Sequence, residues 1–398
     1  MNTPSRTLLA FSGGLDTSFC LLWLREQRRE IHTITVDTGG FSDAELPRIE
    51  KLACELGAES HTTIDARDEL FRDYLRFLLA GNVLRGGVYP LSVSAERVCQ
   101  ARRVVSHARQ ITAVALAHGS TGAGNDQVRF DVAFRTLAPE LEVLTPIREL
   151  ALSRAEERAF LSARGFTFPE KIEQYSINEG MWGTSVGGKE THDSWQHLSD
   201  EAYPGGEIDP ALPARAVTIT FDKGVPSQID GDATSAVAAI DALNAIGRTY
   251  GIGRGIHLGD TILGIKGRVG FEAPAAHLLI AAHRELEKLV LTGKQLFWKE
   301  HLGNLYGTLL HEGQFFDPLA RDLEAFLESS QRVVTGDVRL RISPRSFTIE
   351  GVRSANSLMR FELASYGEGT SLWSGPEAAA FAKIFGVSQM LASRSRGE

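Results

Sequence analysis

A short apolar run near the start of the chain ends in a double glycine and leads into residues with helical spacing. The run is TLLAF from Thr7, and after Ser-Gly-Gly the apolar residues Leu15, Phe19 and Leu22 recur every three or four positions. This pattern predicts a strand, a tight turn and a helix. Further strands are expected at 31–36, 60–64, 112–117 and 142–144, and further helices at 46–56, 70–79 and 95–109. Such repeated units predict an α/β fold whose parallel sheet is covered on both faces and binds ligands beyond the carboxyl ends of its strands.

The alternation of strands and helices stops near residue 168, which divides the chain into three predicted parts. Residues 1–168 form the parallel-sheet domain, and residues 169–372 form an α+β domain that opens with a Gly-rich, aperiodic stretch. In the α+β domain, strands are expected at 216–221, 338–342 and 346–349 and helices at 233–250 and 276–291. Residues 373–398 form a tail whose amphipathic helix, at 376–391, packs on another subunit or on its own domain.

Composition excludes several classes of protein. Of 398 residues, 43% are hydrophobic and 23% are charged, as in ordinary globular proteins rather than disordered or fibrous ones. No window approaches a membrane span and no secretory signal is recognisable, so we expect a cytoplasmic protein with no membrane partner. The net charge of −8 argues against a broad nucleic-acid surface. Cys20, Cys54 and Cys99 are expected to be reduced and packed as small apolar groups.

The sharpest chemical signal is AFSGGLDTS at residues 10–18, between the first strand and the first helix. Glycines let a ligand approach the backbone, and the hydroxyls of Ser12, Thr17 and Ser18 lie beside the positive end of a helix. The motif therefore predicts a binding site for phosphate oxygens, although a Gly-Gly turn can also simply join a strand to a helix. Asp16 either holds a Mg²⁺ ion that bridges phosphates, which we favour, or caps the helix.

Two other glycine motifs do not support a different nucleotide chemistry. GTSVGGKE at 183–190 resembles a Walker A loop, but Glu190 replaces the required Ser or Thr and no apolar strand precedes it. The Gly-x-Gly pairs at 122–124 and 251–253 lack the third glycine of a dinucleotide fingerprint. Without a P-loop lysine at the β and γ phosphates, a site that grips pyrophosphate favours attack at the α phosphate. We therefore expect AMP and pyrophosphate as products.

At this point the residues resemble a known family. SGGLDTS resembles the pyrophosphate loop of the N-type ATP pyrophosphatases, and HGSTGAGNDQVRFDVAF from His118 and YSINEGMWGTS from Tyr175 closely resemble argininosuccinate synthase. The resemblance is strong through about residue 186 and weaker afterwards. It implies an adenine nucleotide α-hydrolase-like first domain and an ATP-dependent ligase in arginine biosynthesis. Such a ligase couples citrulline to aspartate through a citrullyl-AMP, with ATP and Mg²⁺, as a homotetramer.

The resemblance also assigns site residues, position by position. It gives ATP contacts to Ala10, Phe11, Ser12, Gly13, Gly14, Leu15, Asp16, Thr17, Ser18, Val36 and Gly119. It gives aspartate contacts to Thr121, Asn125 and Asp126, and citrulline contacts to Tyr89, Ser94, Asn125, Arg129, Ser176 and Ser185. Asp16, Asn125 and Asp126 are the predicted catalytic residues, with Mg²⁺ at Asp16.

These assignments also make chemical sense by themselves. Asn125 offers a donor and an acceptor, Asp126 can pair with an ammonium group, and Arg129 can fork onto a carboxylate. The alternative for GNDQVRF is a turn followed by a strand or helix with a surface arginine. Ser176 and Ser185 would otherwise be ordinary loop serines, and Tyr89 and Ser94 ordinary turn residues.

The chain departs from the family pattern at three places. Ala123 stands where the family usually has a lysine, so one phosphate-neutralising charge is absent, and Lys171, Lys189 and Arg97 are candidates to replace it.

The other two departures concern the amino-acid end of citrulline. Gly259 replaces a glutamate that contacts citrulline in the family, and Phe271 replaces a tyrosine. As a hypothesis, Asp260 or Glu272 supplies the displaced carboxylate. A further set of residues that could line this pocket is Lys189, Glu190 and Asp193.

Other functions remain as alternatives. A related enzyme could adenylate a different ureido or amide acceptor. A tRNA sulfurtransferase with the same loop would need a catalytic cysteine pair and a basic RNA face, and a nonenzymatic regulator would bind ATP without releasing pyrophosphate. The eleven histidines show no metal-ligand spacing, and His311-Glu312 lacks the second histidine of HExxH, so core or surface histidines are expected.

Overall fold

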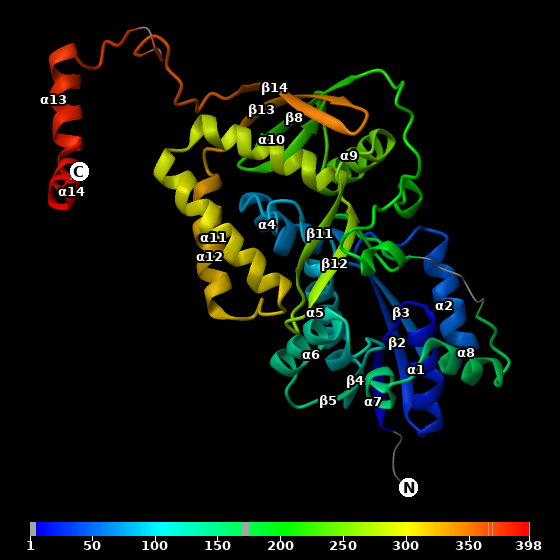
Figure 1. The fold of residues 1–398 in the computed structure, drawn as a ribbon. Helices are drawn as coiled ribbons and strands as arrows, with labels where there is room; N and C mark the ends of the chain where they lie inside the picture. Colours follow the sequence, from blue (N-terminus) through cyan, green and yellow to red (C-terminus); the bar gives the residue numbers. More distant parts are fainter. Residues whose placement is uncertain (1–4, 169–174, 365, 368, 398) are drawn as a thin grey trace. The chain divides into compact units, whose positions relative to one another are not determined.

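A computed structural model describes residues 5–168, 175–364, 366–367 and 369–397 (Figure 1). Two compact units are distinguished, residues 1–354 and 355–398. The predicted boundary near residue 168 lies inside the first unit, beside residues outside the described part, and stays a prediction. Within the described residues, no helix combines the length and the hydropathy required to cross a bilayer.

The first 150 residues form the predicted parallel sheet. Its strands are β1 (Arg6–Ala10), β2 (Glu30–Asp37), β3 (Ser60–Asp65), β4 (Ala115–Ala117) and β5 (Glu142–Leu144), in the order β3-β2-β1-β4-β5, and every pairing is parallel. Successive side chains point to opposite faces, so Leu8 joins one apolar cluster and Leu9 joins another. Both faces of the sheet are therefore buried, as the continuous apolar strands predict.

Helices cover the two faces of this sheet (Figure 1). They are α1 (Leu15–Glu26), α2 (Glu45–Glu55), α3 (Arg67–Leu70), α4 (Arg76–Ala80), α5 (Ser94–Gln110), α6 (Asn125–Leu137), α7 (Pro146–Leu150) and α8 (Arg154–Ser162). A π-helical turn, Phe71–Leu75, joins α3 to α4, so the helix expected at 70–79 is longer and irregular. The strand expected at 112–117 begins only at Ala115, because Thr112 has a positive φ of 54° and ends the turn after α5.

The second part of the first unit contains two antiparallel sheets, which confirms the α+β prediction. One has the order β10 (Asp232–Ala233), β9 (Val225–Ile229), β8 (Arg215–Asp222), β13 (Gly336–Ser343) and β14 (Ser346–Arg353). The other has the order β11 (Arg254–Asp260), β12 (Lys266–Glu272), β7 (Thr184–Gly187) and β6 (Ser176–Asn178). The second sheet was not predicted, since its strands are short or interrupted by glycines and show no clean alternation.

Four long helices complete this unit: α9 (Ala236–Tyr250), α10 (Pro274–Val290), α11 (Gly293–His311) and α12 (Pro318–Gln331). Their apolar residues share one continuous core with the first 150 residues, in which Tyr306 packs on Phe77 at a ring-centroid distance of 5.9 Å. Backbones also meet closely, because a Cβ on Gly303 would lie 2.4 Å from the carbonyl oxygen of Gly81. Helix α11 is thus held against the end of α4 without room for a side chain.

The second unit carries two helices, α13 (Gly375–Phe385) and α14 (Val387–Arg396), where the sequence predicted one. Gly386 separates them, and Pro376 occupies the first turn beside a capping box of Ser374 and Glu377. Phe381, Ile384 and Phe385 are 64%, 72% and 71% exposed. The apolar face of α13 is therefore open.

The three cysteines are free, as expected, but they are not alike. Cys20 and Cys99 are buried, whereas Cys54 is exposed. The prediction of a packed thiol is wrong for Cys54, because it lies near the end of the amphipathic helix α2, where only Ile49 and Ala53 are buried.

Replacing Gly303 by alanine tests the close approach of α11 to Gly81. We expect Gly303→Ala to lower the free energy of unfolding by about 1–3 kcal/mol, because its methyl group must displace backbone. Gly293→Ala, on the same helix with nothing within 4 Å of its Cβ position, should leave it unchanged or slightly higher. Urea unfolding of the full chain measures both, and equal effects would contradict the packing described.

Candidate active site

The turn between β1 and α1 leaves the N-terminus of α1 uncapped by any side chain. Gly14 occupies the N-cap position, and Gly13 has a φ of +72°, a conformation that favours glycine. Ser12 Oγ lies 3.3 Å from Thr17 Oγ1, which donates to the carbonyl of Gly14 at 3.3 Å. Free N–H groups at a helix N-terminus, with hydroxyls beside them, form a binding site for an anion.

The loop after β4 meets this turn, because β4 and β1 are neighbours in the sheet. A Cβ on Gly119 would lie 3.2 Å from the backbone nitrogen of Thr17. His118 orders the loop: its Nδ1 accepts from Ser120 N at 3.2 Å and its Nε2 donates to Asp131 at 2.9 Å. The predicted residue Gly119 therefore lies directly beside the phosphate loop, and Thr121 is exposed just beyond it.

Three of the predicted ATP residues are buried. Phe11 and Val36 are 3% and 5% exposed, so they present little side-chain surface. Ser18 is fully buried, and its Oγ has no hydrogen-bond partner among the described residues. Ser12 and Thr17 are thus the hydroxyls that reach the surface of the turn.

Glu157, which the sequence did not single out, lies against Asp16. Glu157 is on α8, which packs on α1, and it is 1% exposed. Burial, together with the charge of Asp16 and a hydrogen bond to it, raises the pKa of Glu157 to about 8. Near neutral pH the Glu157 carboxyl is therefore held largely in its neutral form.

Asp126, in the first turn of α6, lies between two arginines. Arg97 Nε donates to its Oδ2 at 2.9 Å and Arg129 Nη1 donates to its Oδ1 at 2.8 Å. Burial alone would raise the pKa of Asp126, but the charges of Arg97 and Arg129 prevail and lower it to about 2. Asp126 is thus fixed as a carboxylate.

This geometry bears on the missing lysine at Ala123. Arg97, one of the candidate replacements, is already paired with Asp126. Lys189 lies 3.2 Å from Glu190, so its charge is also matched locally. Lys171 lies outside the described residues. Neither Arg97 nor Lys189 is therefore a free cation for a phosphate.

His311, from the end of α11, contacts two of the predicted citrulline residues. Arg129 Nε donates to the His311 carbonyl at 2.9 Å and Arg129 Nη2 to its Nδ1 at 3.2 Å, while Ser94 Oγ lies 3.0 Å from the same nitrogen. Because arginine only donates, Nδ1 must be an acceptor and the Ser94 hydroxyl must also donate. Burial, with the charge of Arg129, lowers the pKa of His311 to about 2, so the ring is neutral.

Strand register brings the remaining predicted residues to one face of the four-stranded sheet. Ser185 pairs with Phe271 and Asn178, Phe271 pairs with Gly255, and Ser176 lies two residues from Asn178. Residues paired in this way share a face. Tyr89 packs against that face, with its ring 5.4 Å from Phe271.

Asn125 also contacts this sheet. Its Oδ1 accepts from the backbone nitrogen of Ile262, in the turn between β11 and β12, at 2.9 Å. One lone pair of the Asn125 oxygen is therefore used, and its second lone pair and its amide N–H groups remain for a substrate. The described structure thus brings Tyr89, Ser94, Asn125, Asp126 and Arg129 together, with Ser185 on the adjoining sheet face.

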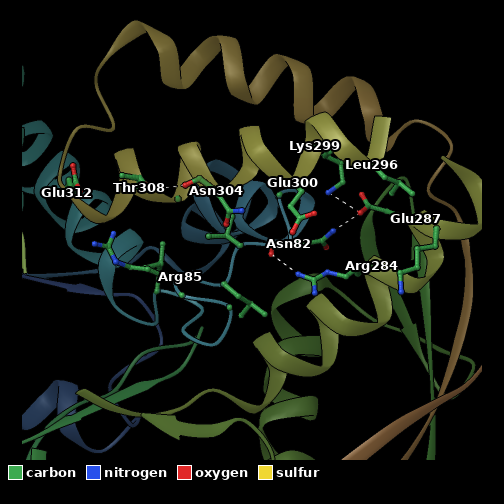
Figure 2. Close-up of a pocket in the computed structure, with 18 residues that line it drawn as sticks. Asn82, Arg85, Arg284, Glu287, Leu296, Lys299, Glu300, Asn304, Thr308 and Glu312 are labelled. Carbon is green, nitrogen blue, oxygen red and sulfur yellow. Dashed lines mark hydrogen bonds and ion pairs between the residues drawn. The ribbon is translucent and has the colours of Figure 1, made fainter. Parts of the chain in front are cut away.

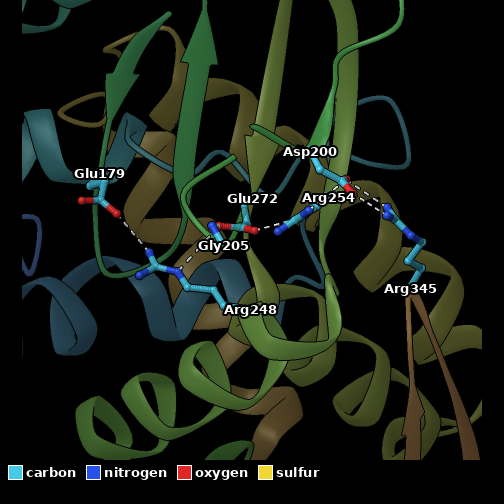
Figure 3. Close-up of polar contacts among 7 residues, drawn as sticks. All are labelled: Glu179, Asp200, Gly205, Arg248, Arg254, Glu272 and Arg345. Carbon is cyan, nitrogen blue, oxygen red and sulfur yellow. Dashed lines mark hydrogen bonds and ion pairs between the residues drawn. The ribbon is translucent and has the colours of Figure 1, made fainter. Parts of the chain in front are cut away.

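The hypothesis that Glu272 or Asp260 replaces the family's glutamate is wrong. Glu272 is fully buried, accepting from Arg254 Nε at 2.8 Å and from Gly205 N at 3.0 Å, in the polar network of Figure 3. Glu272 adjoins Phe271 and so points to the opposite face. Asp260 likewise adjoins Gly259, is exposed and pairs with Lys266 at 2.7 Å. Each carboxylate is one residue out of register with the acceptor face.

The loop carrying Glu190 and Asp193 lies on that opposite face as well. Arg268 alternates with Val269 along β12 and donates to the carbonyls of Glu190, Asp193 and Gln196. This anchoring holds the loop across the sheet from Tyr89. Lining of the acceptor pocket by Glu190 or Asp193 is therefore not supported.

A cavity of about 700 Å³ lies between residues 81–87 and helices α10 and α11 (Figure 2). None of the predicted substrate residues is among the described residues that line it. Its buried charges are matched: Glu287 Oε2 is 2.9 Å from Lys299 Nζ and accepts from Asn82 Nδ2 at 2.6 Å. The network packs α10 and α11 together rather than leaving a free charge for a ligand.

Glu96, a buried acid near Asp126 and Arg97, makes the free energy of unfolding depend on pH. Glu96 is 1% exposed and its Oε1 has no partner among the described residues. Burial raises the pKa of Glu96 to about 8, against the opposing charge of Arg97. Between pH 4.5 and 8 the native state therefore binds more protons than the unfolded state, so the free energy of unfolding falls as pH rises.

Glu96→Gln should remove this dependence. The unmodified protein should lose unfolding free energy between pH 5 and pH 8, and the variant should not. We therefore expect the difference in unfolding free energy, variant minus unmodified protein, to increase by about 1–3 kcal/mol over this range. Urea titrations at pH 5, 6.5 and 8 measure it, with the exposed Glu50→Gln as the control that shows no such gain. A gain in both variants, or in neither, would contradict the assignment.

Comparisons with known proteins agree with this geometry. Residues 6–167 match the model of the arginosuccinate synthase N-terminal HUP domain and residues 175–392 match that of the arginosuccinate synthase C-terminal domain. An argininosuccinate synthase of Dictyoglomus turgidum is 38% identical over 395 residues, covering 99% of this chain and 98% of the relative. That of Xanthomonas axonopodis pv. citri is 39% identical, with 96% and 93% covered, and that of Pyrobaculum aerophilum is 36% identical, with 98% and 99% covered.

Among solved structures, an NH3-dependent NAD synthetase from Campylobacter jejuni matches 42% of this chain and 66% of its own, at 15% identity and a TM-score of 0.30. The two family models and the full-length relatives decide the classification. The chain belongs to the argininosuccinate synthase family.

Proposed function

We propose that the protein ligates citrulline and aspartate in an ATP-dependent reaction that yields argininosuccinate, AMP and pyrophosphate, as a step of arginine biosynthesis. The observation that carries this is the junction of two loops. The uncapped N-terminus of α1 and the loop after β4 meet at Gly119 and Thr17, and Asp126 and Arg129 follow on α6. A site for the phosphates of ATP is thereby joined to a site for amino-acid substrates. The family's relatives support the same reaction.

In this reaction the chain positions reactants and stabilises charge. The α1 N-terminus, with Ser12 and Thr17, binds the outer phosphates and leaves the α phosphate to the ureido oxygen of citrulline. The aspartate amine then displaces AMP from the citrullyl-AMP. No side-chain nucleophile is required, since holding the reactants in line lowers the barrier.

The contacts on α6 leave specific groups for the amino-acid substrates. Arg129 keeps one N–H on each terminal nitrogen after its bonds to Asp126 and His311, and these groups can donate to a substrate carboxylate. Asp126 keeps a lone pair on each oxygen for the aspartate ammonium, and its low pKa keeps it charged. Asn125 donates through its amide nitrogen. His311 and Arg97 are positioning residues, because they hold Arg129 and Asp126 in place.

Asp16, which is half-buried in the first turn of α1 beside the phosphate loop, fits a Mg²⁺ ion. Carboxylate oxygens are the donors that Mg²⁺ prefers, and it commonly takes only one or two from the protein, with phosphate oxygens and water completing its shell. The ion would neutralise phosphate charge there.

We also propose a role for each of the three predicted parts of the chain. Residues 1–168 bind the nucleotide, residues 169–372 complete the acceptor pocket, and residues 373–398 contact another subunit of a cytoplasmic homotetramer. The exposed apolar face of α13 supports the last step, since large exposed apolar residues on one helix face are typical of an interface. Sulfurtransferase chemistry is not favoured, because Cys20 and Cys99 are buried and burial raises the pKa of both thiols.

Pyrophosphate release tests the function. With ATP, citrulline and aspartate the protein should release pyrophosphate and AMP, and omission of ATP or citrulline should abolish the signal. Asp16→Asn should lower the rate by at least about 100-fold, because the Mg²⁺ ion that would neutralise the phosphate charge loses its carboxylate ligand. Asp43→Asn, an exposed change outside the turn, should retain activity. Accumulation of ADP instead of AMP would rule out the proposed chemistry.

A further inference from the structure

We propose that His257 sets the acceptor specificity of this enzyme, by making the amino-acid end of the acceptor pocket uncharged so that ureido acids without an α-ammonium group are accepted alongside citrulline. This inference rests on the proposed function and concerns the acceptor class of the same site.

His257 lies at the acceptor face in contact with a predicted citrulline residue. Its ring stacks on Tyr89 with a centroid distance of 5.5 Å and an interplanar angle of 17°. A Cβ on Gly86 would lie 3.2 Å from His257 Cε1, so the ring is held from a second side. On β11, His257 is two residues from both Gly255 and Gly259, and it therefore shares the face of Ser185 and Phe271.

Gly259 and His257 fit each other. A Cβ built on Gly259 would lie 2.5 Å from His257 Nε2, closer than any real contact. The imidazole of His257 thus occupies the space that the first atoms of a side chain at position 259 would need. A side chain at position 259 therefore requires the His257 ring to move from this placement.

The described acceptor face carries no carboxylate of its own. The members of the four strands on this face are Ser176, Asn178, Ser185, Gly187, Gly255, His257, Gly259, Gly267, Val269 and Phe271. Asp260 and Glu272 point away from it. The nearby carboxylate of Asp126 is shared by Arg97 and Arg129, and its remaining lone pairs are assigned above to the ammonium group of the aspartate substrate. An ammonium group at this end therefore finds no unpaired counter-charge.

The histidines do not supply positive charge either. Burial and the charge of Arg85 lower the pKa of His257, and His311 is neutral for the reasons given above. Neutral imidazole offers one donor and one acceptor, so it can hydrogen-bond to an amine, a hydroxyl or water with little preference. Burying an unpaired ammonium group is unfavourable. An acceptor that lacks this group should therefore bind about as tightly as one that carries it.

The test compares citrulline with 5-ureidopentanoate, which is citrulline without its amino group. Pyrophosphate release with ATP and aspartate gives kcat/KM for each acceptor, and calorimetric titration of the full chain gives each Kd. For the unmodified protein we expect the two acceptors to lie within about 10-fold in both quantities, since no ion pair separates them. A preference for citrulline of about 1,000-fold would overturn the proposal.

The double variant His257→Ala/Gly259→Glu places a carboxylate in the vacated space. It should raise the preference for citrulline by about 30-fold or more, mainly through KM and Kd. Gly259→Glu alone should weaken both acceptors, because its Cβ collides with His257. Leu258→Glu, which adds a carboxylate to the exposed opposite face of the same strand, is the matched control with an unchanged ratio.

The outcomes separate the two proposals. Equal binding of both acceptors without pyrophosphate release refutes the proposed function but not the role of His257. Binding of neither acceptor, or an unchanged ratio in the double variant when urea unfolding shows that it is folded, refutes the role of His257.

Discussion

The candidate site depends on the buried guanidinium of Arg129. It joins α6 to α11 by bonding to Asp126 on its own helix and to the carbonyl and ring of His311. A buried charge is tolerated only when it is paired and hydrogen-bonded, so these partners are a condition of the site and not an accessory to it. The pairing fixes Asp126 as a carboxylate and His311 as a neutral ring, and through His311 it also orients Ser94.

Acidic groups around the site differ in how far nearby charges balance the effect of burial on their pKa. Asp126 is held ionised by two arginines, whereas Glu96 and Glu157 are buried with a raised pKa. For Asp126 the charges of two arginines outweigh the effect of burial on the pKa, whereas for Glu96 burial outweighs the charge of Arg97. For Glu157 the charge of Asp16 adds to the effect of burial, and both raise the pKa.

The acceptor end is governed by strand alternation. Asp260 and Glu272 each adjoin a departure from the family pattern, and in the sequence they look like replacements for the lost glutamate. In antiparallel strands a shift of one residue moves a side chain to the other face, so proximity along the chain does not place them in the pocket. His257, two residues from Gly259, lies on the correct face and occupies the space instead.

The sequence by itself indicated the five parallel strands, the helices α1, α2 and α5, the strand-turn-helix that carries the predicted phosphate site, and the family, because these follow from local periodicity and contiguous motifs. Tertiary structure alone decided the rest. Glu157 meets Asp16, His311 meets Arg129, and His257 meets Tyr89 across long stretches of chain. No local pattern marks such pairs, since each residue gains its role from a partner brought near by packing. The glycine-rich sheet was missed for a related reason: its strands are specified by pairing and not by alternation of apolar residues.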